Sequence, residues 1–151
     1  MTTENQVQAP VNPLTIQINL SILRYIRSNF FQKYLPNFVP VITSDLRTAE
    51  HNAEVGGVPN STHVHGLAED YQLKYAAGGG AVSESQAKAA FEQFIKPNWP
   101  GFAEFEPSKP GEGYHIHAQL SRDISTYTGI VSLAGLGVLG MVIVNSWGKR
   151  A

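Results

Sequence analysis

The chain has 151 residues and a formal net charge of −1, from 11 basic and 12 acidic residues. This length suits one domain with a modest hydrophobic core. The nearly balanced charge argues against a basic surface that binds the phosphate backbone of a nucleic acid, so we expect no nucleic-acid partner. The chain has no cysteine, so any metal ion that it binds would be held by histidine, aspartate or glutamate.

The N-terminal third predicts a polar tail followed by a helix. Residues 1–13 are poor in apolar side chains and lack the basic and apolar stretches of a secretory signal, which indicates a flexible tail. Over residues 19–34 apolar side chains recur at helical spacing, with Asn19 as the predicted N-cap and Pro36 soon after the end. The stripe consists of Leu20, Leu23, Ile26, Phe30 and Tyr34. We expect it to pack against the core.

The middle of the chain alternates between predicted strands, a helix and loops. Residues 39–43 favour a short strand, and a capping box that starts at Ser83 predicts a helix to about Lys96. Residues 97–113, with four prolines, are predicted to form a loop. Trp99 in this loop would either line a substrate groove or pack internally.

The first group of residues that could bind a metal spans residues 61–70. His63 offers an imidazole nitrogen and Asp70, seven residues later, offers a carboxylate oxygen. Gly66 lies between them, where the backbone can bend tightly or approach another segment closely. Catalytic zinc usually keeps three protein ligands and an open fourth position. The block therefore supplies two ligands and requires a third from elsewhere.

The second block is the pair His115 and His117, whose spacing repeats that of His63 and His65. The flanking residues favour a strand over residues 114–120. Side chains two apart on a strand project from the same face, so both rings would point at one site. One ring would bind the metal while the other handles protons or hydrogen-bonds the transition state.

Together these blocks resemble the zinc D-alanyl-D-alanine carboxypeptidases and their phage endolysin relatives, whose superfamily includes lysostaphin-type peptidases and hedgehog domains. The likeness covers residues 43–71, with the pattern SxHxxGxAxD from Ser61 to Asp70, and residues 112–120 with the HxH pair. The resemblance implies that His63, Asp70 and His117 hold Zn²⁺. It also implies that Arg47 faces the carbonyl or carboxylate of the substrate.

Two alignments of the second block remain open. Some family members place a glutamate three residues before the ligand histidine, and Glu112 stands three residues before His115, which would make His115 the ligand. We favour His117 because residues 114–117 fit the HxH form. Either Glu112 or His115 would then be the general base that takes a proton from the attacking water and passes it to the leaving amine.

The C-terminal segment is apolar enough to cross a membrane. Residues 124–148 carry no charge, and residues 127–147 give 21 mostly apolar positions with an aromatic at each end, close to the roughly 20 that a spanning helix needs. Lys149 and Arg150 after this segment favour a cytoplasmic C-terminus, with the catalytic domain on the opposite side. The alternative is a C-terminal hairpin or helix buried in the domain.

The sequence thus predicts an α+β fold in which a small antiparallel sheet carries the zinc site, flanked by helices and followed by a hydrophobic C-terminal helix. The predicted parts are a tail (1–13), a zinc peptidase-like domain (14–123) and a membrane anchor (124–151). We expect a peptidoglycan peptidase held in a virion or host cell envelope, with virion proteins as further partners. The alternatives are a non-catalytic metal-containing module and a membrane-acting protein that functions through its tail.

Overall fold

The computed structural model describes residues 11–123 and Tyr127. Its longest element is helix α1, Pro13–Tyr34. The helix begins six residues earlier than the apolar stripe predicted, because Asn12 caps it by accepting a hydrogen bond from the Leu14 backbone N–H at 2.8 Å, and Pro13 suits a first helical position. The prediction of Asn19 as the cap is therefore wrong, and Asn12 and Pro13 belong to the helix start rather than to a tail.

The predicted apolar stripe of α1 is confirmed as a buried face. Leu20, Leu23, Ile26 and Phe30 are buried, and Tyr34 packs against the core at its edge. Asn19 is also buried, and its side-chain amide donates to the His65 backbone carbonyl at 2.8 Å.

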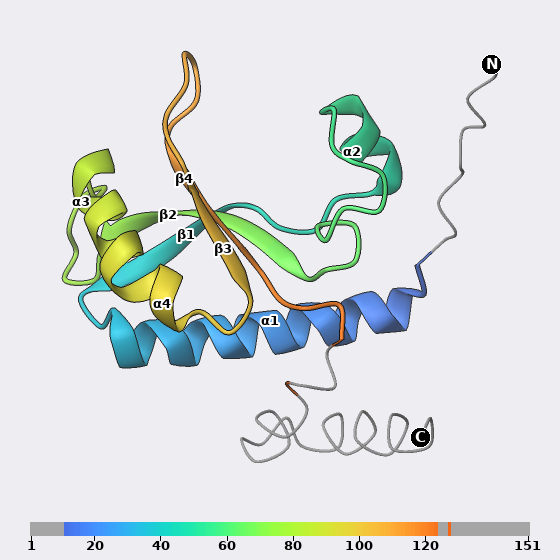
Figure 1. Cartoon of the computed structure of the whole chain (residues 1–151), viewed down its shortest axis with the longest axis horizontal. Helices are drawn as coiled ribbons and strands as arrows, with labels where there is room; N and C mark the ends of the chain where they lie inside the picture. The colour runs from blue at the N-terminus through green and yellow to red at the C-terminus, as the bar shows by residue number, and fades with distance from the viewer. Residues whose placement is uncertain (1–10, 124–126, 128–151) are drawn as a thin grey trace.

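Four antiparallel strands form one sheet above α1, in the order β1-β2-β4-β3 (Figure 1). They are β1 (Phe38–Ser44), β2 (Ala68–Tyr75), β3 (Phe102–Glu106) and β4 (His115–Gln119). Strands β1 and β4 confirm two sequence predictions, and β2 extends from the histidine and aspartate block. The α+β class with a small antiparallel sheet is confirmed over the described residues.

Strand β3 corrects the prediction of a loop over residues 97–113. Its sequence alternates, so that Phe102, Glu104 and Glu106 lie on one face while Ala103 and Phe105 pack against the core. The four prolines of this region all lie outside β3, where they do not remove a hydrogen bond from the ladder. The prolines therefore flank the strand, and their number led to the wrong prediction of a loop.

Short helices lie at the two ends of the sheet (Figure 1). Helix α2, Ala49–Glu54, follows β1 and is capped by Thr48. The predicted second helix forms as α3 (Glu84–Ala90), continuing through a π-helical turn η1 (Phe91–Ile95) into α4 (Lys96–Asn98), and Ser83 caps it as expected. Trp99 is buried, with its ring 5.2 Å from that of Phe30 and its indole N–H bonded to the Gln119 carbonyl, so it packs internally.

Alternation along the strands gives the sheet two chemically different faces. Tyr71 of β2 pairs with Ile116 of β4, and both are buried on the side of α1, where the Phe31 ring lies 5.6 Å from the Tyr71 ring. Asp70 pairs with His117 in the same ladder, so both project from the opposite face. Burial of the α1 side thus fixes which polar residues share the other face.

Among the described residues, no helix is both long and apolar enough to span a bilayer. The predicted membrane segment, 127–147, lies outside the described residues except for Tyr127. Tyr127 is buried, and its hydroxyl accepts a hydrogen bond from the Ser121 backbone N–H at 3.0 Å.

Candidate metal centre

Asp70 and His117 form the centre of the polar face of the sheet. They are direct partners in the β2–β4 ladder, and Nδ1 of His117 lies 2.8 Å from Oδ1 of Asp70. Both side chains are largely buried, at 10 % and 14 % exposure. Strand pairing alone therefore brings together two residues that are 47 positions apart in the chain.

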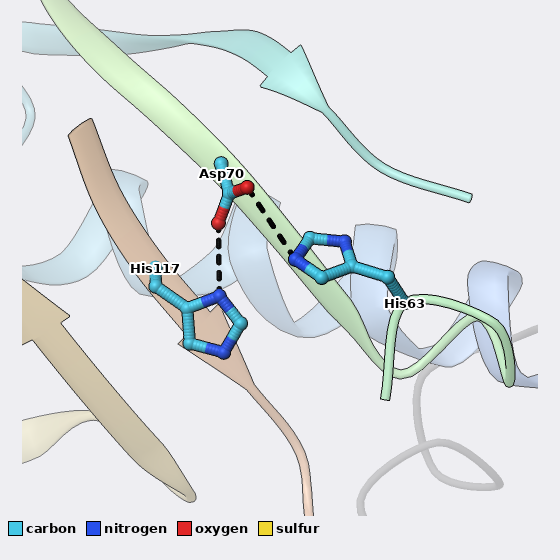
Figure 2. Close-up of side chains that lie close together, drawn as sticks. All are labelled: His63, Asp70 and His117. Atoms are coloured by element: carbon cyan, nitrogen blue, oxygen red, sulfur yellow. Dashed lines mark hydrogen bonds and ion pairs between the residues drawn. The ribbon is translucent and has the colours of Figure 1, made fainter. Parts of the chain in front are cut away.

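The third member, His63, comes from the loop before β2 (Figure 2). Its Nε2 lies 3.4 Å from Oδ2 of Asp70. The loop is held against α1, because Gly66 has φ +70° and a Cβ there would lie 3.0 Å from the Ile16 carbonyl oxygen. Only glycine adopts this conformation without strain and also allows so close an approach, as the sequence suggested. Ligand atoms of His63, Asp70 and His117 all lie within 4.8 Å of one another.

Hydrogen bonds outside the cluster fix which imidazole nitrogens can bind a metal. Nδ1 of His63 lies 2.7 Å from the Asp45 carbonyl, so it carries the proton and Nε2 keeps its lone pair. Nε2 of His117 lies 3.0 Å from Oε1 of Gln119, which leaves Nδ1 bare in the neutral ring. These two nitrogens are the ones that face the Asp70 carboxylate. They donate to it when they carry a proton and can bind a metal when they do not. A set of two nitrogens and one carboxylate with oriented outer partners fits a zinc ion.

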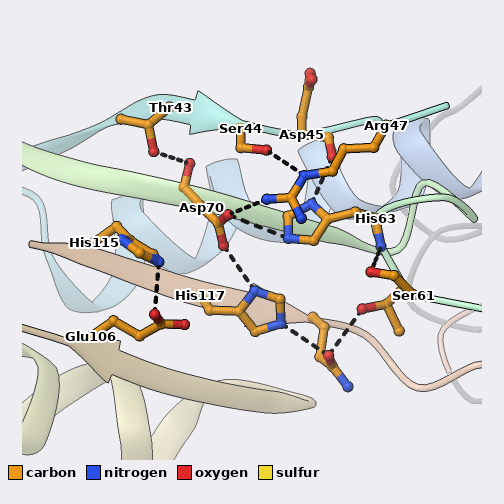
Figure 3. A network of polar contacts seen from close by, with 12 residues as sticks. Thr43, Ser44, Asp45, Arg47, Ser61, His63, Asp70, Glu106, His115 and His117 are labelled. Carbon is orange, nitrogen blue, oxygen red and sulfur yellow. Dashed lines mark hydrogen bonds and ion pairs between the residues drawn. The ribbon is translucent and has the colours of Figure 1, made fainter. Parts of the chain in front are cut away.

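Arg47 joins the cluster from the segment between β1 and α2 (Figure 3). Its guanidinium donates to Oδ2 of Asp70 at 3.2 Å and to the Ser44 hydroxyl at 3.2 Å. Burial alone would raise the pKa of the Asp70 carboxyl, but hydrogen bonds from His117 and His63 outweigh it and hold the pKa well below its usual range. Asp70 therefore stays ionised, as a metal ligand must.

The same pairing acts on His117. Burial lowers the pKa of its imidazole, but the hydrogen bond to Asp70, followed by the bond to Gln119, raises the pKa above the ordinary value. Without a metal, a proton on Nδ1 thus stabilises the contact with Asp70. This contact keeps the His117 ring in place for an ion.

A cleft of about 580 Å³ opens beside the cluster. Four of the six predicted site residues line it: Arg47, Asp70, Glu112 and His115. His51, Val55 and Gln72 complete much of the remaining wall. The cleft offers a cation, a carboxylate and an imidazole next to the candidate metal ligands, which suits a polar, carbonyl-rich substrate.

Comparison with known families agrees with this geometry. The model of the peptidase M15 family matches residues 1–98 of the chain. The chain belongs to the peptidase M15 family. The matched range includes Arg47, His63 and Asp70, whereas the HxH pair lies beyond it. No curated protein and no solved structure shows significant similarity to the chain.

Within this M15 chain the two histidines of β4 occupy different places. His117 lies in the metal-ligand cluster, whereas His115 lies outside it and contacts Glu106 of β3, with Nε2 3.2 Å from Oε2. Glu112 lies at the turn before β4, where its backbone pairs with Lys109. The geometry thus agrees with the alignment in which His117, rather than His115, is the third ligand.

Sequence reasoning missed three groups that the structure places around the site: the Asp45 carbonyl, Gln119 and Glu106. The strand pattern offered a signal for Gln119, because His115, His117 and Gln119 follow each other at a spacing of two on one face. Glu106 was concealed by the expected loop over 97–113. The role of the Asp45 carbonyl carries no sequence signal, since every residue has such a group.

Proposed function

We propose that this M15 family member is a zinc peptidase that cleaves peptide stems or cross-links of bacterial peptidoglycan. The observation that carries the proposal is the convergence of His63, Asp70 and His117, with an ionised Asp70 between two imidazole nitrogens that can bind a metal once unprotonated. The adjoining cleft, with Arg47, Glu112 and His115 in its wall, supports turnover rather than a purely structural ion.

Zinc held by these three residues would polarise the scissile carbonyl and lower the pKa of a coordinated water to about 7. His115 or Glu112 is placed in the cleft wall, where either could accept a proton from the attacking water and return it to the leaving amine nitrogen. Arg47 has one donor on Asp70 and one on Ser44. Its charge lies at the cleft wall, where it would attract the carbonyl or terminal carboxylate of a peptide stem.

The peptidase proposal is tested with full-length protein on purified cell walls. With zinc supplied, we expect new amino termini to appear, and His63→Ala to lose this release because one nitrogen ligand is gone. Lys88→Ala, on α3 and outside the cleft, is the control and should match the unchanged protein. Absence of release from walls of every stem and cross-link chemotype would contradict the proposal and favour a non-catalytic metal module.

We also propose that residues 127–147 anchor the enzyme in a viral or host envelope membrane. The support is compositional: residues 128–147 are uncharged and mostly apolar, end in Trp147 and are followed by Lys149 and Arg150, while Tyr127 itself packs in the domain core. Two lysines placed at Leu136 and Leu139 should release the protein from lipid vesicles, since each costs about 2.5–3.5 kcal/mol at the centre of a spanning helix.

The matched control for the anchor places the same two lysines at Thr2 and Thr3, near the N-terminus. This variant should co-sediment with vesicles as the unchanged protein does. Equal distribution of all three proteins between vesicles and buffer would show that the segment does not anchor the chain. Detection of the protein in purified phage particles would test its association with virions.

A further inference from the structure

Glu106 and His115 form a carboxylate–imidazole pair at the edge of the candidate site. They are direct partners in the β3–β4 ladder, and Nε2 of His115 lies 3.2 Å from Oε2 of Glu106. Figure 3 shows the two side chains meeting beside the candidate metal ligands His63, Asp70 and His117. The His115 side chain is 26 % exposed and that of Glu106 is 36 % exposed, so both are partly shielded from solvent.

The contact favours one of the two ring nitrogens of His115 as the one that carries the proton. The contact is a 3.2 Å ion-pair approach. Because a carboxylate oxygen only accepts, it favours a proton on Nε2 and leaves the Nδ1 lone pair in the neutral ring. The carboxylate thus favours one tautomer and one orientation of the imidazole. In catalytic sites, a carboxylate that orients an imidazole in this way acts through the histidine and does not itself take the proton.

We propose that Glu106 is the positioning residue for His115 in the peptidase reaction. This inference rests on the proposed function and deepens it by choosing His115 over Glu112 as the group that moves the proton. Nδ1 of His115 accepts a proton from the attacking water and returns it to the leaving amine nitrogen, while Glu106 holds Nε2–H throughout. No bond to Glu106 forms or breaks.

Glu112 is less well placed for this task. It is exposed, and its side chain makes no hydrogen bond or ion pair with any described residue, so nothing holds it in one position. Glu106 in contrast is fixed by its strand and by His115. Its other charged neighbour, Lys109, has its Nζ 4.0 Å from the same Oε2 and is 64 % exposed, which makes it a weak competitor.

Kinetics on wall peptides provide the first test. Glu106→Ala should lower kcat by about 10–100-fold, the usual effect of losing a group that orients a catalytic or ligand side chain, with little change in KM. Glu106→Gln can still accept the hydrogen bond and should recover part of kcat. Lys109→Gln removes the competing cation and should leave kcat unchanged, as should Glu92→Gln on the surface of η1. An unchanged kcat in Glu106→Ala would overturn the proposal that Glu106 contributes to catalysis through His115.

The second test does not depend on activity. Nitrogen-15 NMR of the His115 ring in the folded protein should show a protonated Nε2 and a bare Nδ1, and Glu106→Ala should produce a mixture of tautomers. Glu106→Gln and Lys109→Gln should retain the single tautomer. An unchanged tautomer in Glu106→Ala would overturn the positioning role. If the unchanged protein cleaves no wall peptide, the peptidase proposal fails, whereas this measurement still decides whether Glu106 positions His115.

Discussion

Asp70→Asn should abolish zinc binding and lower kcat/KM by at least about 1,000-fold, equivalent to ~4 kcal/mol of transition-state stabilisation. Asparagine keeps the shape of the side chain but replaces one acceptor oxygen by a donor. The Asp70 carboxylate faces His63, His117 and Arg47 at once. No orientation of an amide satisfies all of these partners, and a neutral amide is a poor ligand for zinc beside two imidazoles.

Zinc content and thermal unfolding together test this expectation. Zinc at a 100-fold excess over its Kd should stabilise the unchanged protein by about 2.7 kcal/mol, because it binds the folded state alone. It should not stabilise Asp70→Asn. Asp123→Asn, an exposed aspartate after β4, is the matched control and should bind zinc and cleave substrate normally. Retention of one zinc per chain in Asp70→Asn would show that these three residues are not the ligand set.

Arg27→Met should destabilise the fold by roughly 3 kcal/mol, or about 10 °C in Tm for a chain of this size. Arg27 on α1 forms an ion pair with Glu69 of β2, whose side chain is only 2 % exposed. Burial raises the pKa of Glu69 to about 7, even though Arg27 lowers it. Removing Arg27 leaves a buried carboxylate without a counter-charge, which destabilises a fold more than replacing both partners of the pair.

The loss of stability caused by Arg27→Met should depend on pH. The folded pKa of Glu69 lies above the unfolded value of about 4.5, so its ionisation weakens the fold as pH rises through that interval. Without Arg27 the folded pKa moves still higher. Arg27→Met should therefore lose more stability at pH 8 than at pH 5, as measured by denaturant unfolding at both values.

Two further variants isolate the Arg27–Glu69 interaction. Arg24→Met, one turn earlier on α1, breaks an exposed pair with Asp45 at 3.8 Å and should cost less than about 1 kcal/mol. Adding Glu69→Gln to Arg27→Met should recover stability, because the unpaired charge is then gone. Equal losses for Arg27→Met and Arg24→Met would contradict the assignment of a costly buried pair.

Local patterns in the sequence predicted much of the described fold. The apolar stripe of α1, the capping box at Ser83 and the alternation around His115 and His117 each depend on residues a few positions apart. Short-range periodicity is enough for such elements. Where a second signal competed, prediction failed, as when the prolines around β3 outweighed its own alternation.

The nature of the site followed from residue types, and its arrangement followed from tertiary structure. Without cysteine, the spaced histidines and Asp70 already indicated a metal bound by nitrogen and oxygen. The sequence could not choose between His115 and His117, because both point to the same face of β4. The β2–β4 register sets Asp70 opposite His117 and thereby favours His117 as the ligand. The β3–β4 register likewise set Glu106 opposite His115. Pairing of strands distant in the chain depends on packing of the whole sheet against α1, and no local pattern encodes it.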